Sequence, residues 1–414
     1  MPGKPFLNSK RLRYALIAGG ALWIGWLISL IFGSGNKDLA GQVVGTDYVQ
    51  FYAAGTTLRM GESVYLYDFE YQHQLEQKII GSPIEGLHGF ITPPFMAWVF
   101  VPFSTLPYEW SFAIWSILGL VFLWLSLRWL NAKYILSHFT WALSWFPIFA
   151  AISFGQNSIL SLAILCLTYK LWRHGRLWTA GLACSLVLYK PQLALGVGLL
   201  WLLEWRRDWK ALAGLAVGAG ILVGLSLGFM PEVSIDYIKF SRTILPILLS
   251  QEGFPIWHAH TPRAFWQLLL PGLPRLADGL FGLCLVAGIA AYVYFWRRFR
   301  SQPATVKTNA WLYAGAISLT LWLSPHAMIY DWAILLIPAV LLRQNSTAVR
   351  QNSTAVWQNT TADWKGIFAL VWVATFLSGP LTLAQLKLLP FAVQISVPIL
   401  AVALVWILRV LREA

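Results

Sequence analysis

The succession of apolar segments constrains the fold of this chain more than any other feature. The chain is 58% hydrophobic and only 11% charged, with a mean hydropathy of +0.62, which lies outside the range of soluble proteins. A helix needs about 20 apolar residues to cross a bilayer. The apolar runs lie at about 14–33, 93–107, 109–130, 139–154, 158–172, 177–189, 192–205, 209–230, 276–296, 308–325, 328–342, 366–384 and 391–409. They predict an all-α polytopic membrane protein, with residues 1–414 forming a single integral-membrane domain.

Charge predicts how these segments are oriented. Lys and Arg number 30 against 17 Asp and Glu, but the basic residues occur in short clusters between apolar runs, which indicates a membrane protein rather than a nucleic-acid partner. Lys10, Arg11 and Arg13 place the N-terminus in the cytoplasm. If 93–107 is a re-entrant or surface segment and 109–130 a crossing, later clusters predict about twelve transmembrane helices with both termini cytoplasmic. Two full crossings between 93 and 130 are the alternative. We expect a multi-pass protein of the plasma membrane.

Three polar intervals interrupt the apolar runs. Residues 34–93 form a large first extracytoplasmic loop, which holds seven of the 17 acidic residues between Asp38 and Glu85. Residues 231–275 form a second extracytoplasmic loop, too long for a simple connector. Residues 343–363 contain a seven-residue tandem repeat of low complexity, which we interpret as a linker.

One lysine interrupts an apolar stretch. Residues 177–205 carry basic residues on both flanks, so the chain must go out and return within them, with the reversal at Tyr189-Lys190-Pro191. An ionisable group in the hydrocarbon is costly unless it meets water or an anion, which makes Lys190 a functional candidate. The alternative is that Lys190 extends to the outer headgroups.

The chemical inventory favours group transfer from an anionic carrier. The sequence contains no glycine-rich phosphate loop, no H-E-x-x-H and no clustered His/Cys set, and the first loop has no paired acids for a metal. We therefore predict no cofactor and no metal ligands, while leaving a bound divalent cation open. An early acid could take a proton from a hydroxyl, and fixed cations could stabilise a departing lipid phosphate.

Several short motifs carry a resemblance to a known family. They are Asp47-Tyr48 with Tyr52, Thr92-Pro93-Pro94 with Pro102, Gly155-Gln156-Asn157, Tyr189-Lys190-Pro191 and Ser324-Pro325-His326. In this order they resemble glycosyltransferase family 87, a branch of the glycosyltransferase-C superfamily that includes polyprenyl-phosphate-mannose-dependent mannosyltransferases. The resemblance implies a glycosyltransferase-C-like helical bundle with its active site at the extracytoplasmic face. It also implies glycolipid biosynthesis: an inverting transfer of a hexose, often mannose, from a polyprenyl-phosphate sugar donor to a lipid or glycan acceptor.

The resemblance also assigns roles to residues. Asp47 is by position the catalytic acid of the first outer loop and would serve as general base; the alternative is an N-cap of a helix that starts near Tyr48. His326 would act as base or orient the acceptor, unless it is a buried histidine that donates to a backbone carbonyl. Lys190 and Arg263 would bind the donor phosphate, although an interfacial arginine is often only an anchor. The remaining candidates for substrate binding are Tyr48, Tyr52, Gln156, Asn157, His258 and His260.

Two other classes of membrane protein share these features. A transporter or flippase of lipid-linked glycans would have a similar number of helices, but we see no internal duplication of the kind that transporters show. A ligase that joins preassembled lipid-linked glycans would differ mainly in the size of its donor. We therefore predict a hexosyltransferase.

Overall fold

The computed structural model describes residues 9–86, 89–132, 134–250, 254–300, 306–349 and 355–413. Within these ranges the regular structure is helical, and the only strand-like pairings there are three isolated bridges. The predicted all-α class is therefore confirmed.

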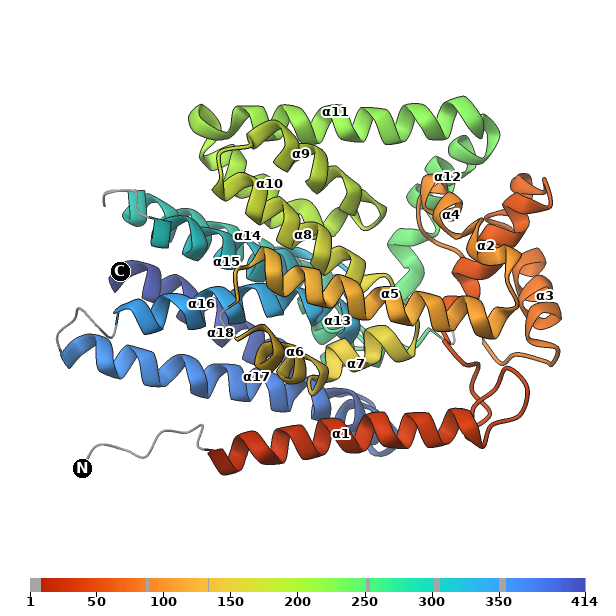
Figure 1. Cartoon of the computed structure of the whole chain (residues 1–414), viewed down its shortest axis with the longest axis horizontal. Coiled ribbons are helices and arrows are strands. Elements are labelled where there is room, and N and C mark those ends of the chain that lie inside the picture. The colour runs from red at the N-terminus through yellow and green to blue at the C-terminus, as the bar shows by residue number, and fades with distance from the viewer. Residues whose placement is uncertain are drawn as a thin grey trace.

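Five of the described helices are long and apolar enough to cross a membrane: α1 (Ser9–Ile31), α5 (Tyr108–Trp129), α11 (Trp205–Phe229), α14 (Pro274–Arg300) and α17 (Ala355–Leu388). They lie roughly along one direction in Figure 1. A sixth span results if α6 (Ile135–Leu143) and α7 (Phe146–Ser153), bent by 72°, are counted as one. Their apolar stretches are no more than 33% buried, so most of that surface is left for lipid. This confirms a membrane protein, while the number of about twelve crossings stays a prediction.

The shorter helices complete the bundle. They are α8 (Ser158–Arg173), α9 (Leu177–Ser185), α10 (Leu195–Leu203), α13 (Pro262–Leu269), α15 (Val306–Leu323), α16 (Leu336–Val349) and α18 (Ser396–Glu413). The start of α1 and the end of α18 lie at the same end of the bundle, on the left of Figure 1. Residues 350–354 of the predicted linker 343–363 lie outside the described residues; α16 and α17 take up the residues on either side.

The opposite end of the bundle is formed by the two polar intervals. The interval 34–93 folds into α2 (Tyr48–Arg59) and α3 (Phe69–Ile80), and α12 (Pro231–Thr243) joins them from the second interval (Figure 1). The segment 93–107 contains only α4 (Pro94–Phe100) and one short 3-10 turn, so its longest helix has seven residues and does not reach across a bilayer. The Phe51 ring stacks on Phe100 at 4.9 Å, which fixes α4 against α2.

The apolar run 177–205 breaks at Lys190, as the charge pattern predicts. Two 3-10 turns flank this residue, whose backbone lies at φ −130° and ψ 75°. Helix α9 packs on α11 so closely that a Cβ on Gly181 would lie 2.0 Å from the Ala211 carbonyl oxygen. Small residues allow such close approach between helices that have no hydrophobic driving force to associate in lipid. The break leaves the Lys190 side chain inside the bundle, with 13% of its surface exposed.

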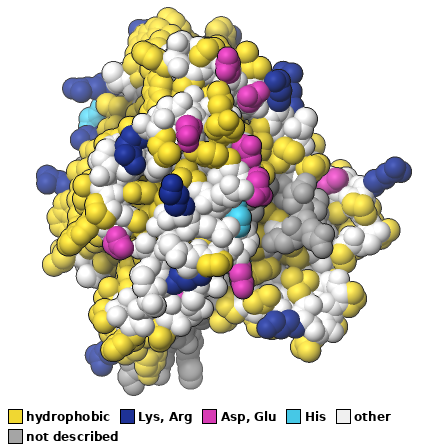
Figure 2. Space-filling view, turned by 90° about the vertical axis from the view of Figure 1, so that its right-hand side faces the viewer, with side chains coloured by type: hydrophobic (Ala, Val, Ile, Leu, Met, Phe, Trp, Pro, Cys, Tyr) yellow, Lys and Arg dark blue, Asp and Glu magenta, His cyan; other side chains and the backbone are white. Residues whose placement is uncertain are grey.

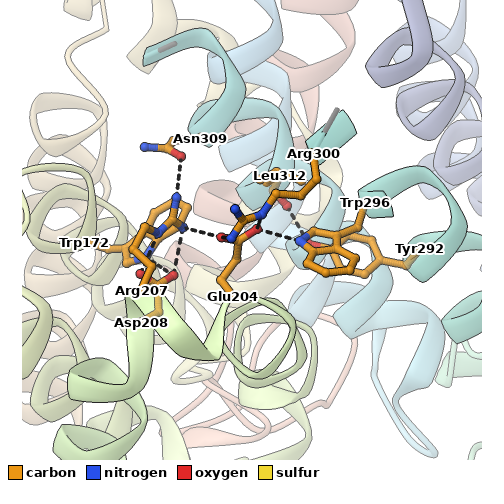
Figure 3. A network of polar contacts seen from close by, with 9 residues as sticks. All are labelled: Trp172, Glu204, Arg207, Asp208, Tyr292, Trp296, Arg300, Asn309 and Leu312. Carbon is orange, nitrogen blue, oxygen red and sulfur yellow. Dashed lines mark hydrogen bonds and ion pairs between the residues drawn. The ribbon is translucent and has the colours of Figure 1, made fainter. Parts of the chain in front are cut away.

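A network of polar contacts lies where α10 joins α11 (Figure 3). The buried Glu204 carboxylate accepts hydrogen bonds from Trp296 Nε1 at 2.6 Å and Arg300 Nε at 2.8 Å. The buried Asp208 carboxylate accepts from Trp172 Nε1 at 2.8 Å. Because buried charges are costly unless they are paired, these contacts hold α8, α11 and α14 together.

Candidate active site

Asp47 immediately precedes α2, where its backbone N–H donates to the Phe154 carbonyl at 3.0 Å. It occupies the N-cap position, yet its side chain makes no capping hydrogen bond. The carboxyl instead lies close to the side chains of Gln156 and Tyr330, which come from two other parts of the chain and lower its pKa. The capping alternative therefore does not account for the side chain, which belongs to a polar cluster inside the bundle.

The surroundings make Asp47 a stronger base than an ordinary aspartate. Burial raises the pKa of its carboxyl from 3.8 to about 6, because an ionised carboxylate loses solvation among protein atoms. Hydrogen bonding from Gln156 and the charge of Lys190 oppose this rise, and the Asp331 carboxylate adds to it. Asp47 as a whole residue is of intermediate exposure, while its carboxyl group is enclosed by protein atoms. A carboxylate with a pKa of about 6 suits general-base catalysis near neutral pH.

Lys190 forms an ion pair with an acid that sequence reasoning did not assign to the site. Its Nζ lies 2.8 Å from Asp331 Oδ1, and only 4% of the Asp331 side chain is exposed. The same oxygen accepts a hydrogen bond from Ser158 Oγ at 2.7 Å, and Oδ2 accepts from the Met328 N–H at 3.2 Å. Asp331 is the only acid in the apolar run 328–342, and this isolated charge is the sequence signal that could have identified it as a site residue.

Gln156 connects this ion pair to Asp47. Its Oε1 lies 3.5 Å from Lys190 Nζ, and its Nε2 donates to the Tyr330 hydroxyl at 3.1 Å. The Lys190 ammonium also lies 5.2 Å from the centre of the Tyr330 ring, within the range of a cation–π contact. Tyr330 is thus a further member of the cluster that the sequence did not reveal.

Asn157 lies beside this cluster in an unusual state. It is fully buried, and neither its side-chain oxygen nor its side-chain nitrogen has a hydrogen-bond partner. Its backbone carbonyl accepts a hydrogen bond from the Tyr189 hydroxyl at 3.1 Å. An unpaired buried amide costs free energy, so a polar partner for this side chain would stabilise the protein.

His326 lies in the short connection after α15 and is partly buried. Burial lowers the pKa of its imidazole; the negative charge of Asp331 opposes this effect, and the positive charges of Lys190 and Arg263 add to it. The imidazole is therefore within electrostatic reach of the ion pair and is neutral near pH 7. A neutral imidazole can accept a proton or hydrogen bond through one nitrogen and donate through the other.

Arg263 lies in the first turn of α13. Its Nη2 donates to the Pro246 carbonyl at 3.0 Å, and its Nε lies 3.7 Å from Asp278 Oδ1. The side chain is 18% exposed, which leaves part of the guanidinium open. The positive charge of Arg263 thus acts on His326. The direct contacts of Arg263, however, connect the second polar interval to the start of α14.

His258 and His260 have separate surroundings. The His258 ring lies against Trp257, with centroids 3.7 Å apart, and burial lowers the pKa of His258 to about 4. His260 is 1% exposed, and its Nδ1 shares a hydrogen bond of 2.7 Å with Ser396 Oγ. Burial, with a smaller contribution from His258, lowers the pKa of His260 to about 3. No group of three potential metal ligands occurs in the described part of the chain.

The two tyrosines predicted to bind substrate are buried at the end of the bundle that α2, α3 and α12 form. The Tyr48 hydroxyl shares a hydrogen bond of 2.6 Å with Ser111 Oγ, and the Tyr52 hydroxyl donates to the Leu106 carbonyl at 2.7 Å. Both contacts join α2 to the segment that precedes α5 or to α5 itself. The structure therefore engages these hydroxyls away from the Asp47 cluster, and their role in binding stays a prediction.

The cluster borders two different surroundings. Acidic, basic and histidine side chains are spread among apolar ones over the end of the molecule that lies on the right of Figure 1 (Figure 2). On the other side, Gln156 lines a small cleft between α5, α7 and α8, whose walls include Trp115, Phe122 and Ile159.

Fold and site together define a helical membrane protein with a carboxyl of raised pKa and a paired lysine close to the end of the bundle that α2, α3 and α12 form. The family model for glycosyltransferase family 87 matches residues 90–325, which is more than half of the 414-residue chain. The chain belongs to glycosyltransferase family 87 and is a membrane glycosyltransferase. The matched stretch contains Gln156, Lys190 and Arg263, whereas Asp47 and Asp331 lie outside it. No curated protein and no solved structure matches the chain.

Proposed function

We propose that the protein transfers a hexose, with mannose as the first candidate, from a polyprenyl-phosphate sugar to a hydroxyl of a lipid or glycan acceptor. The reaction takes place at the extracytoplasmic face of the plasma membrane, with both termini in the cytoplasm. Membership of the family supplies the class of reaction. The observation that carries the proposal is Asp47, which is not used as a helix cap and has its pKa raised to about 6.

In the proposed reaction Asp47 is the general base. The acceptor oxygen attacks the anomeric carbon from the face opposite the phosphate, and its proton passes to the Asp47 carboxylate. The bond from the anomeric carbon to the phosphate oxygen breaks, the electron pair leaves with polyprenyl phosphate, and the anomeric configuration is inverted. With a pKa of about 6, about nine-tenths of Asp47 is ionised at pH 7 and ready to accept the proton.

The donor phosphate lies, in this proposal, near Lys190, Arg263 and His326. The two cations both act on the His326 imidazole, which supports one shared space between them. Lys190 keeps its partner Asp331, so it contributes a fixed dipolar contact rather than a free charge, and Arg263 supplies the more exposed cation. Preorganised charges of this kind stabilise the charge that develops on a leaving phosphate.

The surroundings of the cluster support a lipid-linked substrate. The cleft that ends at Gln156 is lined mostly by apolar side chains, and the adjacent helix α5 exposes apolar surface such as Ile117 and Val121. A polyprenyl chain could lie along this surface with its phosphate at the polar end. Asn157, with its unpaired buried amide, is the candidate to hydrogen-bond the sugar.

Transfer assays with the purified full chain test the proposal. Polyprenyl-phosphate mannose and polyprenyl-phosphate glucose are offered with a lipid acceptor extract to the wild type and to the Asp47→Asn variant. Glu85→Gln, a neutralised exposed acid of the same outer interval, is the matched control. We expect transfer by the wild type and the control and none by Asp47→Asn. Equal activity of all three variants would rule out Asp47 as base.

The same assay addresses the cofactor and the donor. The proposal includes no resident cofactor, so activity should survive chelation with EDTA; loss on chelation and recovery with Mg²⁺ or Mn²⁺ would require a bound cation. Absence of transfer from every polyprenyl-phosphate sugar would contradict the proposed reaction and favour a flippase or a glycan ligase.

A further inference from the structure

A chain of polar contacts runs from Asp331 to Asp47. Asp331 Oδ1 holds Lys190 Nζ at 2.8 Å, and Lys190 Nζ lies 3.5 Å from Gln156 Oε1. The Gln156 Nε2 donates to the Tyr330 hydroxyl at 3.1 Å, and the side chains of Gln156 and Tyr330 both lower the pKa of the neighbouring Asp47 carboxyl. Asp47 immediately precedes α2, Gln156 lies between α7 and α8, and Lys190 lies between two 3-10 turns. Tyr330 and Asp331 belong to a third 3-10 turn (Ile329–Leu335), so the chain of contacts exists only in the folded protein.

The Lys190 ammonium determines which way the Gln156 amide points. An ammonium only donates hydrogen bonds, so the amide end that faces it must be the oxygen. The NH₂ group then faces Asp47 and Tyr330, where it can donate to the carboxylate. If the amide turned over, its oxygen would oppose the Asp47 carboxylate, which also only accepts. The orientation of Gln156 therefore depends on the position of Lys190.

Asp331 in turn determines the position of Lys190. A lysine side chain is long and flexible, and a charge inside the bundle needs a fixed partner. Ser158 Oγ and the Met328 N–H hold the Asp331 carboxylate in place at 2.7 and 3.2 Å, so that it cannot follow a moving ammonium. With only 4% of its side chain exposed, Asp331 has little contact with solvent or substrate.

We infer that Asp331 is a positioning residue, which orients the base Asp47 through Lys190 and the side-chain amide of Gln156. The inference rests on the proposed function, since it assigns Asp47 the role of base. Asp331 does not touch the reacting atoms. It keeps the donor NH₂ of Gln156 directed at the carboxylate and keeps the Lys190 charge at a fixed distance from it.

Charge substitutions make the inference testable through the pH profile of kcat/KM. The charged and titratable groups that act on Asp47 are Lys190, which lowers its pKa, Asp331, which raises it, and Tyr330, which lowers it by hydrogen bonding. Asp331→Asn should therefore move the acid limb of the profile to lower pH, and Lys190→Met should move it to higher pH. The double variant removes one charge of each sign and should return the limb close to that of the wild type.

Rates give a second readout. Loss of a partner that orients a metal ligand costs on the order of tenfold to a hundredfold in activity, and we expect a fall of similar size in kcat of Asp331→Asn. The double variant should be no slower than the slower single variant, because both substitutions interrupt one chain of contacts. Gln156→Leu interrupts the same chain without touching Asp331, and it should lose kcat to a similar extent even if Asp331→Asn folds poorly.

Glu204→Gln is the control for a purely structural effect, since it neutralises another buried, paired acid at the α10–α11 junction. It should lower the melting temperature while leaving the acid limb in place. A wild-type kcat and an unshifted limb in Asp331→Asn, with Asp47→Asn inactive, would overturn the inference and leave the proposed function standing. An inactive wild type would overturn both.

Discussion

The pH dependence of transfer depends most directly on the state of Asp47. The carboxyl must be ionised to accept the hydroxyl proton, and its pKa is raised to about 6. Activity should therefore be full above that pKa and should be lost as the pH falls through it. An aspartate with the ordinary pKa would keep the enzyme active to a much lower pH.

The size of the effect follows from the fraction of Asp47 that is ionised. For a pKa of about 6, about 91% of the carboxyl is ionised at pH 7 and about 9% at pH 5, so kcat/KM should fall about tenfold between these values. For an unperturbed aspartate about 94% would still be ionised at pH 5, and the fall would be less than 10%. The two cases differ far more than the error of a rate measurement.

The raised pKa also has a consequence for stability. The folded protein binds the proton more tightly than the unfolded chain, so the contribution of Asp47 is fully present below pH 3.8 and is lost as the pH rises to about 6. At pH 7 the ionised carboxylate costs up to about 3 kcal/mol. Asp47→Asn should therefore be inactive and yet melt at a higher temperature than the wild type, as occurs where function requires a destabilised group.

Initial rates of transfer to a fixed lipid acceptor from pH 4.5 to 8.5 measure the first effect, and melting curves of wild type and Asp47→Asn at pH 4 and pH 7 measure the second. The enzyme must recover its activity when returned to pH 7, which excludes acid unfolding as the cause of the fall. A flat rate profile down to pH 5, or an Asn variant that melts below the wild type at pH 7, would refute the argument.

Three further predictions concern residues outside the polar cluster. Tyr48→Phe removes the buried hydrogen bond to Ser111 and should cost about 1 kcal/mol in thermal or denaturant unfolding; the predicted role in substrate binding requires a higher KM as well. Glu76 is fully buried without partners for either oxygen, and burial raises its pKa to about 8, so stability should decrease as the pH rises from 4.5 to 8. Glu76→Gln should thus melt above the wild type at pH 8 and close to it at pH 4, and equal shifts at both pH values would contradict this. A Cβ on Gly196 would lie 1.9 Å from a backbone oxygen of α15, whereas Gly198 faces open space, so Gly196→Ala should lower the melting temperature and Gly198→Ala should not.

Hydropathy predicted the helical class and the long spans because a long apolar helix can be recognised from its own residues alone. The runs at 14–33, 109–130 and 209–230 correspond to α1, α5 and α11. The number of crossings is a different kind of property. Whether a short helix such as α10 reaches both faces of the bilayer depends on how it packs against its neighbours, and nothing in its own nine residues encodes this.

The candidate site shows the same division between local and tertiary information. Asp47 was assigned by its position in the first polar interval together with the resemblance to glycosyltransferase family 87, and Lys190 because a charge interrupts an apolar run. The same rule applied to Asp331, the only acid in its run, would have made it a candidate. Its role could not be predicted, since the pairing of Lys190 with Asp331 rather than with Asp47 is decided by the packing of distant segments. Both acids and the lysine are visible in the sequence. That Lys190 pairs with Asp331, which leaves Asp47 as the proposed base, follows only from their arrangement in the folded chain.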